Sequence, residues 1–409
     1  MSVTKFKKMK NLKNLSLMEI VEELKVQNLM KHDFVVPARY IKMFETQLQV
    51  VNESNLDEFS KLLLDTGIVC EDATMEMIYL TLLDCCHSQI SSRLDIPKKY
   101  YDKMLSDEKN HYLLDQNVTH WFNSKSNQNY LLRTFIDKEN KTGIARAILS
   151  DRYNILDNYD VMLATLDAIK ESGINVQIES GDITDTKFFM RFVCPEIELE
   201  ASELLKNYRV PNGSKGGNGI ISGFVISNSE TGNGKFSISP RAMVLACRNG
   251  MIFKDDSFEK THLGGKMEQY SSIDWSEDTR QKNYELVCSQ VKDAINFYAS
   301  KEYLGAKIHE LMEKGNKELS YPIETIKNVS KHLSIGEEKE KNILNYFIKS
   351  GDTNAFGVTQ AITYFAHQNC TPEERYDLES QSVVILDMID GFDKPEIKQS
   401  PFQGTIALN

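Results

Sequence analysis

The chain has 409 residues, of which 41% are hydrophobic and 26% charged, which is ordinary for a soluble globular protein of two or three domains. Its formal net charge of −11 argues against a protein coated in basic surface for duplex DNA, but it leaves room for a local cationic groove. No apolar run is long enough to span a bilayer and no signal-peptide core follows the basic N-terminus, so we expect a cytoplasmic protein without membrane contact.

The seven cysteines are scattered and odd in number, which argues against a disulfide framework. The one cluster, Cys85-Cys86-His87, lacks a second pair of ligands at zinc spacing and lies in an apolar run. Buried small side chains explain this cluster better than a metal site does. We therefore expect no metal and no cofactor.

The first third, residues 1–128, is predicted to be a helical N-terminal region. The segment LSLMEIVEELKVQNLMKH has apolar residues at helical spacing, and residues 55–70 and 72–92 indicate two further helices. Pro37 marks a break in the segment that follows the first of these helices.

Residues 129–275 are predicted to form a central α+β domain. A polar turn at 138–143 lies between two strand-like runs, and a helix follows that Asp157 or Asn158 caps and Gly173 ends. Two more β-type runs are expected at about 174–180 and 187–194.

The segment SNSETGNGKFSIS at 227–239 is close to a phosphate-binding loop, which needs G-x-x-x-x-G-K-[ST]. Ser229 replaces the first glycine and Phe236 replaces the final hydroxyl residue. A phosphate-binding loop also precedes a helix, whereas both flanks here have the composition of strands. The segment therefore predicts a β-hairpin with its turn at 231–234, followed by a strand and a short helix that Gly250 ends.

Helical periodicity returns in residues 276–392, which we predict as a helical C-terminal region, with a tail at 393–409. The expected fold class is thus α+β. A central mixed domain with antiparallel β-hairpins and packed helices is flanked by helical N- and C-terminal regions.

Five ordered blocks together resemble a family of uncharacterised phage and plasmid proteins, domain of unknown function 932. The blocks are DFVVPARYI, GIARAILSDRYNILDNYDVMLATL, ISGFVISNSETGNGKFSISPRAMVLACRNGMI, THLGG and NAFGVTQAITYFAH. The resemblance covers most of the chain in the right order. It implies a mobile-element context and no established activity, so the residues must carry the functional argument.

The stretch from Lys206 to Arg248 is the only long one with a clear basic excess, with six cations against Glu230 alone. The SDRY block at 150–153 adds an arginine beside an aromatic residue, the combination that single-stranded nucleic acid needs for phosphate contact and base stacking. An internal ion pair and a tyrosine covering a helix end explain the same block equally well. The candidate nucleic-acid-binding residues are Arg146, Arg152, Tyr153, Lys215, Lys235, Arg241 and Arg248.

We expect a phage or plasmid protein that binds nucleic acid, most simply a single-stranded DNA binding or annealing factor in replication or recombination. Whether the nucleic acid is DNA or RNA, and whether the chain forms a homo-oligomer, stays open. One alternative is a virion-associated or host-interaction protein, which suits an acidic chain flanked by helices. Another is an enzyme acting on nucleic acid, but no catalytic arrangement is recognisable, and a non-enzymatic role is favoured.

Overall fold

The computed structural model describes residues 12–52, 57–72, 75–211, 217–262 and 277–395. The predicted α+β class is confirmed, with helices near both ends of the chain. The chain forms two compact units, and each is assembled from separate segments. Unit 1 consists of Met1–Val193, Val225–Ser239 and Ser257–Asn296, and unit 2 of Cys194–Phe224, Pro240–Asp256 and Phe297–Asn409.

Unit 1 contains a seven-stranded sheet, here called the N-terminal sheet. Its order is β2-β7-β8-β6-β4-β3, with β5 paired to β6. The pairs are antiparallel except β6 with β8, which run parallel. The strands are β2 (Phe34–Pro37), β3 (Ile41–Phe44), β4 (Gln47–Asn52), β5 (Cys70–Asp72), β6 (Met75–Leu82), β7 (Asn129–Asp137) and β8 (Thr142–Ser150).

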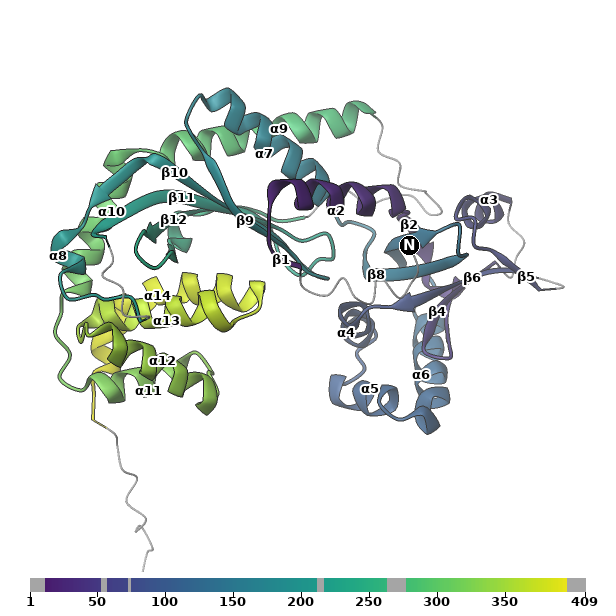
Figure 1. The fold of residues 1–409 in the computed structure, drawn as a ribbon. Coiled ribbons are helices and arrows are strands. Elements are labelled where there is room, and N and C mark those ends of the chain that lie inside the picture. Colours follow the sequence, from purple (N-terminus) through teal and green to yellow (C-terminus); the bar gives the residue numbers. More distant parts are fainter. Residues whose placement is uncertain (1–11, 53–56, 73–74, 212–216, 263–276, 396–409) are drawn as a thin grey trace, which may run out of the picture. The chain divides into compact units, whose positions relative to one another are not determined.

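One face of the N-terminal sheet packs against helices in a single hydrophobic core. Leu48, Ile78 and Leu132 from the strands meet Phe59, Tyr101 and Phe122 from the helices there, all fully buried. Figure 1 shows α4, α5 and α6 gathered on one side of the sheet. The elements on this face are η1 (Ala38–Tyr40), α3 (Asp57–Asp65), α4 (Asp84–Arg93), α5 (Lys98–Leu105), η2 (Glu108–Asn110) and α6 (His111–Ser124).

The second sheet, here called the central sheet, has the order β1-β9-β10-β11-β12-β13, with β14 paired to β12. The predicted hairpin around 227–239 is present as the neighbouring strands β11 and β12. The strands are β1 (Leu12–Leu15), β9 (Gln177–Ile183), β10 (Phe188–Glu200), β11 (Gly219–Asn228), β12 (Phe236–Val244), β13 (Asn249–Ile252) and β14 (Phe258–Lys260).

Two long helices of unit 1 adjoin the site, α2 at its end and α7 at its start. Helix α2 (Leu17–Met30) starts with a capping box, in which Ser16 and Glu19 satisfy each other's backbone N–H groups. Helix α7 (Asn158–Ser172) begins after Asp157 and ends at Gly173, whose φ of 69° is left-handed, as the sequence predicts. Helix α9 (Glu277–Tyr298) follows β14 along the chain.

Unit 2 is built on a helical bundle, which Figure 1 shows in green to yellow. Its core joins residues of α10, α12, α13 and α14, among them Leu311, Phe347, Phe356 and Ile385. The helices are α8 (Ser202–Leu205), α10 (Lys301–Gly315), α11 (Pro322–His332), α12 (Glu337–Ser350), α13 (Ala355–Asn369) and α14 (Pro372–Phe392), with η3 (Lys254–Asp256) between strands.

Two local predictions are wrong. Residues 75–82 form strand β6 instead of the first half of a helix, because an apolar run such as MEMIYLTL has no periodicity that separates a buried strand from a buried helix. The short helix expected before Gly250 is a turn between β12 and β13, in which Arg248 has a positive φ of 57°. Within the described ranges, no helix has both the length and the apolar composition needed to cross a membrane.

Candidate functional site

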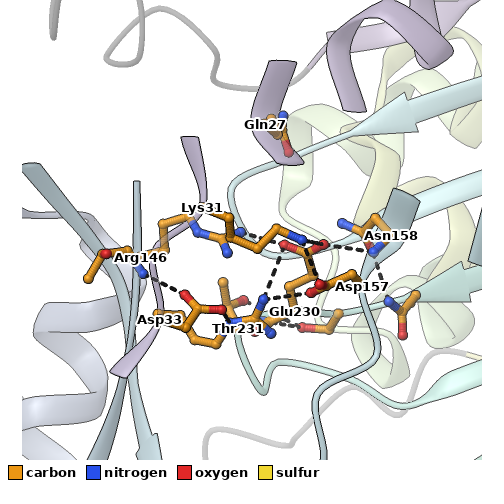
Figure 2. A network of polar contacts seen from close by, with 12 residues as sticks. Gln27, Lys31, Asp33, Arg146, Asp157, Asn158, Glu230 and Thr231 are labelled. Atoms are coloured by element: carbon orange, nitrogen blue, oxygen red, sulfur yellow. Dashed lines mark hydrogen bonds and ion pairs between the residues drawn. The ribbon is translucent and has the colours of Figure 1, made fainter. Parts of the chain in front are cut away.

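Six buried or nearly buried charges meet where β7, β8, the start of α7 and the β11–β12 connection of unit 1 come together. Three are cations and three are carboxylates: Lys31, Arg133 and Arg146, and Asp33, Asp157 and Glu230. Figure 2 shows this cluster, here called the charge network, with its ion pairs as dashed lines. Its formal charges cancel, which is the condition for burying so many at once.

Arg133 is the centre of the charge network and is completely buried. Its Nε lies 2.7 Å from Asp33 Oδ2, and its Nη2 lies 2.7 Å from Asp157 Oδ1. Its third nitrogen, Nη1, donates to the backbone carbonyl of Glu230 at 3.3 Å. One guanidinium therefore joins three segments that are far apart in the sequence.

Glu230 lies in the β11–β12 connection, and its two carboxylate oxygens accept hydrogen bonds from different donors. Oε2 accepts from Arg146 Nη1 at 2.6 Å. Oε1 accepts from the backbone N–H of Asn158 at 2.7 Å, which is the first residue of α7. The carboxylate thus caps the positive end of α7, while Asp157, at the usual capping position, pairs with Lys31 Nζ at 2.9 Å instead.

The charge network favours the ionised forms of Glu230 and Asp157. Burial raises the pKa of Glu230, but attraction to the three cations outweighs burial and holds the pKa well below its ordinary value. The same balance lowers the pKa of Asp157. Burial disfavours the charged form of Arg133, and its carboxylate neighbours more than offset this and raise its pKa.

The connection between β11 and β12 is a packed structural segment, not a phosphate-binding loop. Ser229 Oγ donates to the carbonyl of Thr186 at 2.7 Å, and Tyr153 Oη donates to the carbonyl of Ser229 at 2.7 Å. Ser229, Glu230 and Thr231 are all buried, and Gly232 supplies a φ of 75° that only glycine adopts easily. The glycine of this motif serves the backbone turn.

A pocket adjoins the charge network in unit 1, and its roughly 520 Å³ of free space includes a part that is open to solvent. Phe135, Ile144 and Ile183 give it an apolar side, and Arg146, Lys187 and Thr231 are among its polar groups. Arg146 lies over the ring of Phe135, with Cζ 4.0 Å from the ring centroid.

The other end of the same sheet face is partly open. Cross-strand pairing places Lys42 opposite Gln49 and Gln49 opposite Tyr79, so these side chains share one face. Phe44 is 51% exposed and its ring lies 6.3 Å from that of Tyr79. We call Lys42, Phe44, Gln49 and Tyr79 the aromatic row. Their face is opposite the helix-covered core, since Met43, Leu48, Ile78 and Leu80 point into that core.

The predicted nucleic-acid-binding residues have several different environments. Arg146 and Tyr153 are buried in unit 1, and Arg241 is buried in unit 2 beside Glu379. The ring of Tyr153 stacks on that of His262, with centroids 5.1 Å apart. Arg152 and Arg248 are exposed, Lys235 is half-exposed and paired with Glu259 at 2.8 Å, and Lys215 lies outside the described residues.

Sequence reasoning missed most of the charge network. The sequence predicts Asp157 only as a helix cap, and it gives no sign that Lys31, Asp33 and Arg133 meet. Glu230 was visible as the one acid in a basic stretch, and an isolated carboxylate between cations is the kind of signal that could have identified it. The aromatic row was missed because its members come from three strands whose register the sequence does not specify.

Comparison with protein-family models, with curated proteins and with solved structures finds no match to this chain. In the part of the chain that the structure describes, no three His, Cys, Asp or Glu side chains are grouped closely enough to hold a metal ion. His87 of the Cys85-Cys86-His87 cluster lies with its Nδ1 2.9 Å from Tyr101 Oη. The charge network, the pocket and the aromatic row are therefore the candidate functional features of this chain.

Proposed function

We propose that this chain binds single-stranded nucleic acid and serves a phage or plasmid in replication or recombination. The observation that carries the proposal is the aromatic row on the open face of the N-terminal sheet. The row combines one exposed ring, that of Phe44, with the half-buried ring of Tyr79, beside a cation and an amide. Unpaired bases stack on aromatic rings that a sheet presents in this way. The mobile-element context comes from the resemblance of the sequence blocks alone.

The composition of this face favours nucleic acid over a protein partner. Its positions on β3, β4 and β6 are Lys42 and Phe44, then Gln47, Gln49 and Val51, then Met77 and Tyr79. One of these seven is a cation and none is an acid, although the whole chain is strongly acidic and the neighbouring strand β5 places Asp72 opposite Met75 of β6. Gln49 Nε2 donates to Tyr79 Oη at 3.0 Å, which fixes the position of the phenol ring. A ring that is already held in place loses little conformational entropy when a base stacks on it.

The exposed arginine of the SDRY block adds to the proposal in a second way. Arg152 is exposed in unit 1 and can contact phosphate without regard to sequence. Arg146 and Tyr153 belong to the interior, so we assign the base-stacking role to the aromatic row and not to the SDRY block. The chain then acts in the cytoplasm of the host cell, and formation of a homo-oligomer along a strand is part of the same proposal.

The test is fluorescence anisotropy of labelled oligo-dT and oligo-rU with the full chain at low salt, where phosphate contacts are strongest. Phe44→Ala removes one stacking surface and is expected to weaken binding by about tenfold, since one base–aromatic stack contributes about 1–3 kcal/mol. Phe258→Ala is the matched control, because Phe258 is a partly exposed phenylalanine of unit 1 on the central sheet. The Phe258→Ala variant should bind the oligonucleotides with the affinity of the wild type.

Two results would count against the proposal. One is that neither oligonucleotide binds at low salt, and the other is that Phe44→Ala and Phe258→Ala have the same affinity. Salt gives a further check, because binding through phosphates weakens steadily as salt rises. The difference between oligo-dT and oligo-rU decides whether the strand is DNA or RNA.

A second candidate, binding of a protein partner, is favoured by a groove in unit 2. Leu333, Ile335 and Leu378 contribute its apolar floor, and Glu337, Glu338 and Asp377 contribute negative charge. This combination suits a basic segment with apolar anchors. Co-purification of a basic protein that Leu378→Asp abolishes, without change in oligonucleotide affinity, would favour this role.

A further inference from the structure

We propose that the pocket beside Arg146 is a binding site for a singly charged oxyanion, carried on a small flat or apolar group. This site is distinct from the aromatic row and does not depend on the nucleic-acid binding proposed for that row. It lies at the β7–β8 end of the same sheet face, and its walls come entirely from unit 1. The inference starts from the hydrogen bonds of a single guanidinium.

Arg146 uses only one of its three nitrogens within the protein. Nη1 donates to Glu230, whereas Nε and Nη2 are buried and have no hydrogen-bond partner. The residue is 4% exposed and lines the pocket. Nε and Nη2 form one edge of the guanidinium, and this edge holds a carboxylate or a phosphate through two parallel hydrogen bonds.

A buried donor without an acceptor is costly, about 1–3 kcal/mol, and more for a charged group. An oxyanion in the pocket would supply two acceptors at once and relieve this cost. Arg146 is held ready for it, because the ring of Phe135 supports one face and Glu230 fixes Nη1 at 2.6 Å. A fixed donor edge loses little rotamer entropy on binding.

The remaining walls of the pocket suit the organic group to which the charged oxyanion is attached. Leu83, Ile144 and Ile183 offer an apolar surface, which suits a flat or hydrocarbon group. Gln27 and Thr231 stand among the polar lining groups, and Gln27 Nε2 already donates to Glu23 at 2.8 Å. The site therefore combines one strong anion contact with a mixed wall, as expected for a small organic acid or ester.

The charges around the pocket favour an anion with a single charge. The charge network is neutral in sum, so it adds no net attraction beyond the free edge of Arg146. Outside the network, Lys187 brings one cation to the wall and Asp185 brings one carboxylate, so these charges cancel too. A doubly charged phosphate monoester would therefore gain little further attraction from the wall, whereas removing it from water costs more than removing a singly charged ion.

Two sources share this chemistry. A small carboxylate presents a singly charged oxyanion on an organic group, and so does the phosphodiester of a nucleic-acid strand. Benzoate represents the first source, and thymidylyl-thymidine, a dinucleoside with one internal phosphodiester, represents the second. Benzyl alcohol and thymidine are their uncharged counterparts, which separate recognition of the anion from burial of the ring.

The experiment is calorimetric titration of the full chain with these four probes. We expect one or both anions to bind and the uncharged counterparts not to bind. Arg146→Lys keeps a cation for Glu230 and removes the two-donor edge, so affinity for the anion should fall by about tenfold or more. Arg39→Lys, the same change at an exposed arginine of unit 1, should leave it unaltered.

Each outcome decides the proposal. Binding of benzoate alone assigns a free carboxylate, and binding of the dinucleotide alone assigns a strand phosphodiester. Failure of both anions to bind overturns the proposal, as does equal affinity in Arg146→Lys and wild type. If Arg146→Lys does not fold, the second variant is Lys187→Met, which removes the half-buried cation of the pocket wall. Unchanged affinity of Lys187→Met for the anions would also overturn the proposal. Phe44→Ala leaves this site untouched, so its result reports on the aromatic row separately.

Discussion

Arg146 Nη1 lies 2.6 Å from Glu230 Oε2, and both side chains are about 95% buried although 84 residues separate them in the sequence. This pair joins strand β8 to the connection between β11 and β12. Through Oε1 of the same carboxylate it also reaches the first N–H of α7. Three distant segments of unit 1 thus depend on a single buried acid.

The first prediction concerns the loss of that acid. Glu230→Gln leaves three buried cations facing two carboxylates and should destabilise unit 1 by about 3–5 kcal/mol, the usual result of breaking a buried ion pair from one side. Urea denaturation of the full chain measures the loss. Glu259→Gln is the matched control, because Glu259 pairs with half-exposed Lys235 at the surface and should change stability by less than about 1 kcal/mol. Equal losses in the two variants would show that the charge network does not stabilise the unit.

The second prediction is a pH dependence with a definite sign. The folded pKa of Glu230 is lower than its ordinary value of 4.5, so the unfolded chain takes up the proton first as the pH falls. The stability that this carboxylate contributes is present above pH 4.5 and is lost as the pH falls toward the folded pKa. Free energies of unfolding measured from neutral to acid pH should fall less steeply in Glu230→Gln than in wild type. Parallel curves would contradict the assignment.

The sequence predicted well wherever the signal is local. The β7–β8 hairpin was found from the polar turn between two apolar runs, and α7 from its cap residues Asp157 and Gly173. The hairpin of β11 and β12 was found because Asn-Gly stood between two β-type runs. Each of these elements is specified by residues within a few positions of one another.

The charge network could not be predicted in the same way, because its pairs are formed by tertiary folding. Lys31 and Glu230 are 199 residues apart in the sequence, and the residues around each give no indication that the two form a pair. For the same reason the sequence predicts Arg146 and Arg241 as nucleic-acid-binding residues, whereas both are buried. An arginine in a basic stretch gives no local sign that a distant carboxylate will bury it.

The third prediction concerns Asp352 of unit 2, which is 1% exposed. Burial raises its pKa from the ordinary 3.8 to about 6, so the folded chain holds the proton more strongly than the unfolded chain. The stability linked to this proton is present below pH 3.8 and is lost as the pH rises through about 6. Asp352→Asn should therefore be more stable than wild type at neutral pH and lose this pH dependence. Denaturation curves at acid and neutral pH measure both effects, and a less stable variant at neutral pH would contradict the prediction.

The fourth prediction tests a close approach between backbone and side chain in unit 2. Gly250 of β13 lies under the guanidinium of Arg241, and a β-carbon at position 250 would overlap it. Arg241 cannot easily move aside, since it is buried and pairs with Glu379 at 3.4 Å, which in turn accepts from Arg375 at 2.9 Å. Gly250→Ala should therefore cost about 1–3 kcal/mol, the range for overpacking a filled interior.

The matched control for this prediction is Gly391→Ala in α14, where no atom lies within 4 Å of the added carbon. Alanine favours helix over glycine, so this variant should equal or slightly exceed the wild type in stability. Thermal unfolding of the two variants and the wild type, measured side by side, gives the comparison. If Gly250→Ala unfolds at the wild-type temperature, Arg241 has room to shift and the buried pair with Glu379 is not held in place by Gly250.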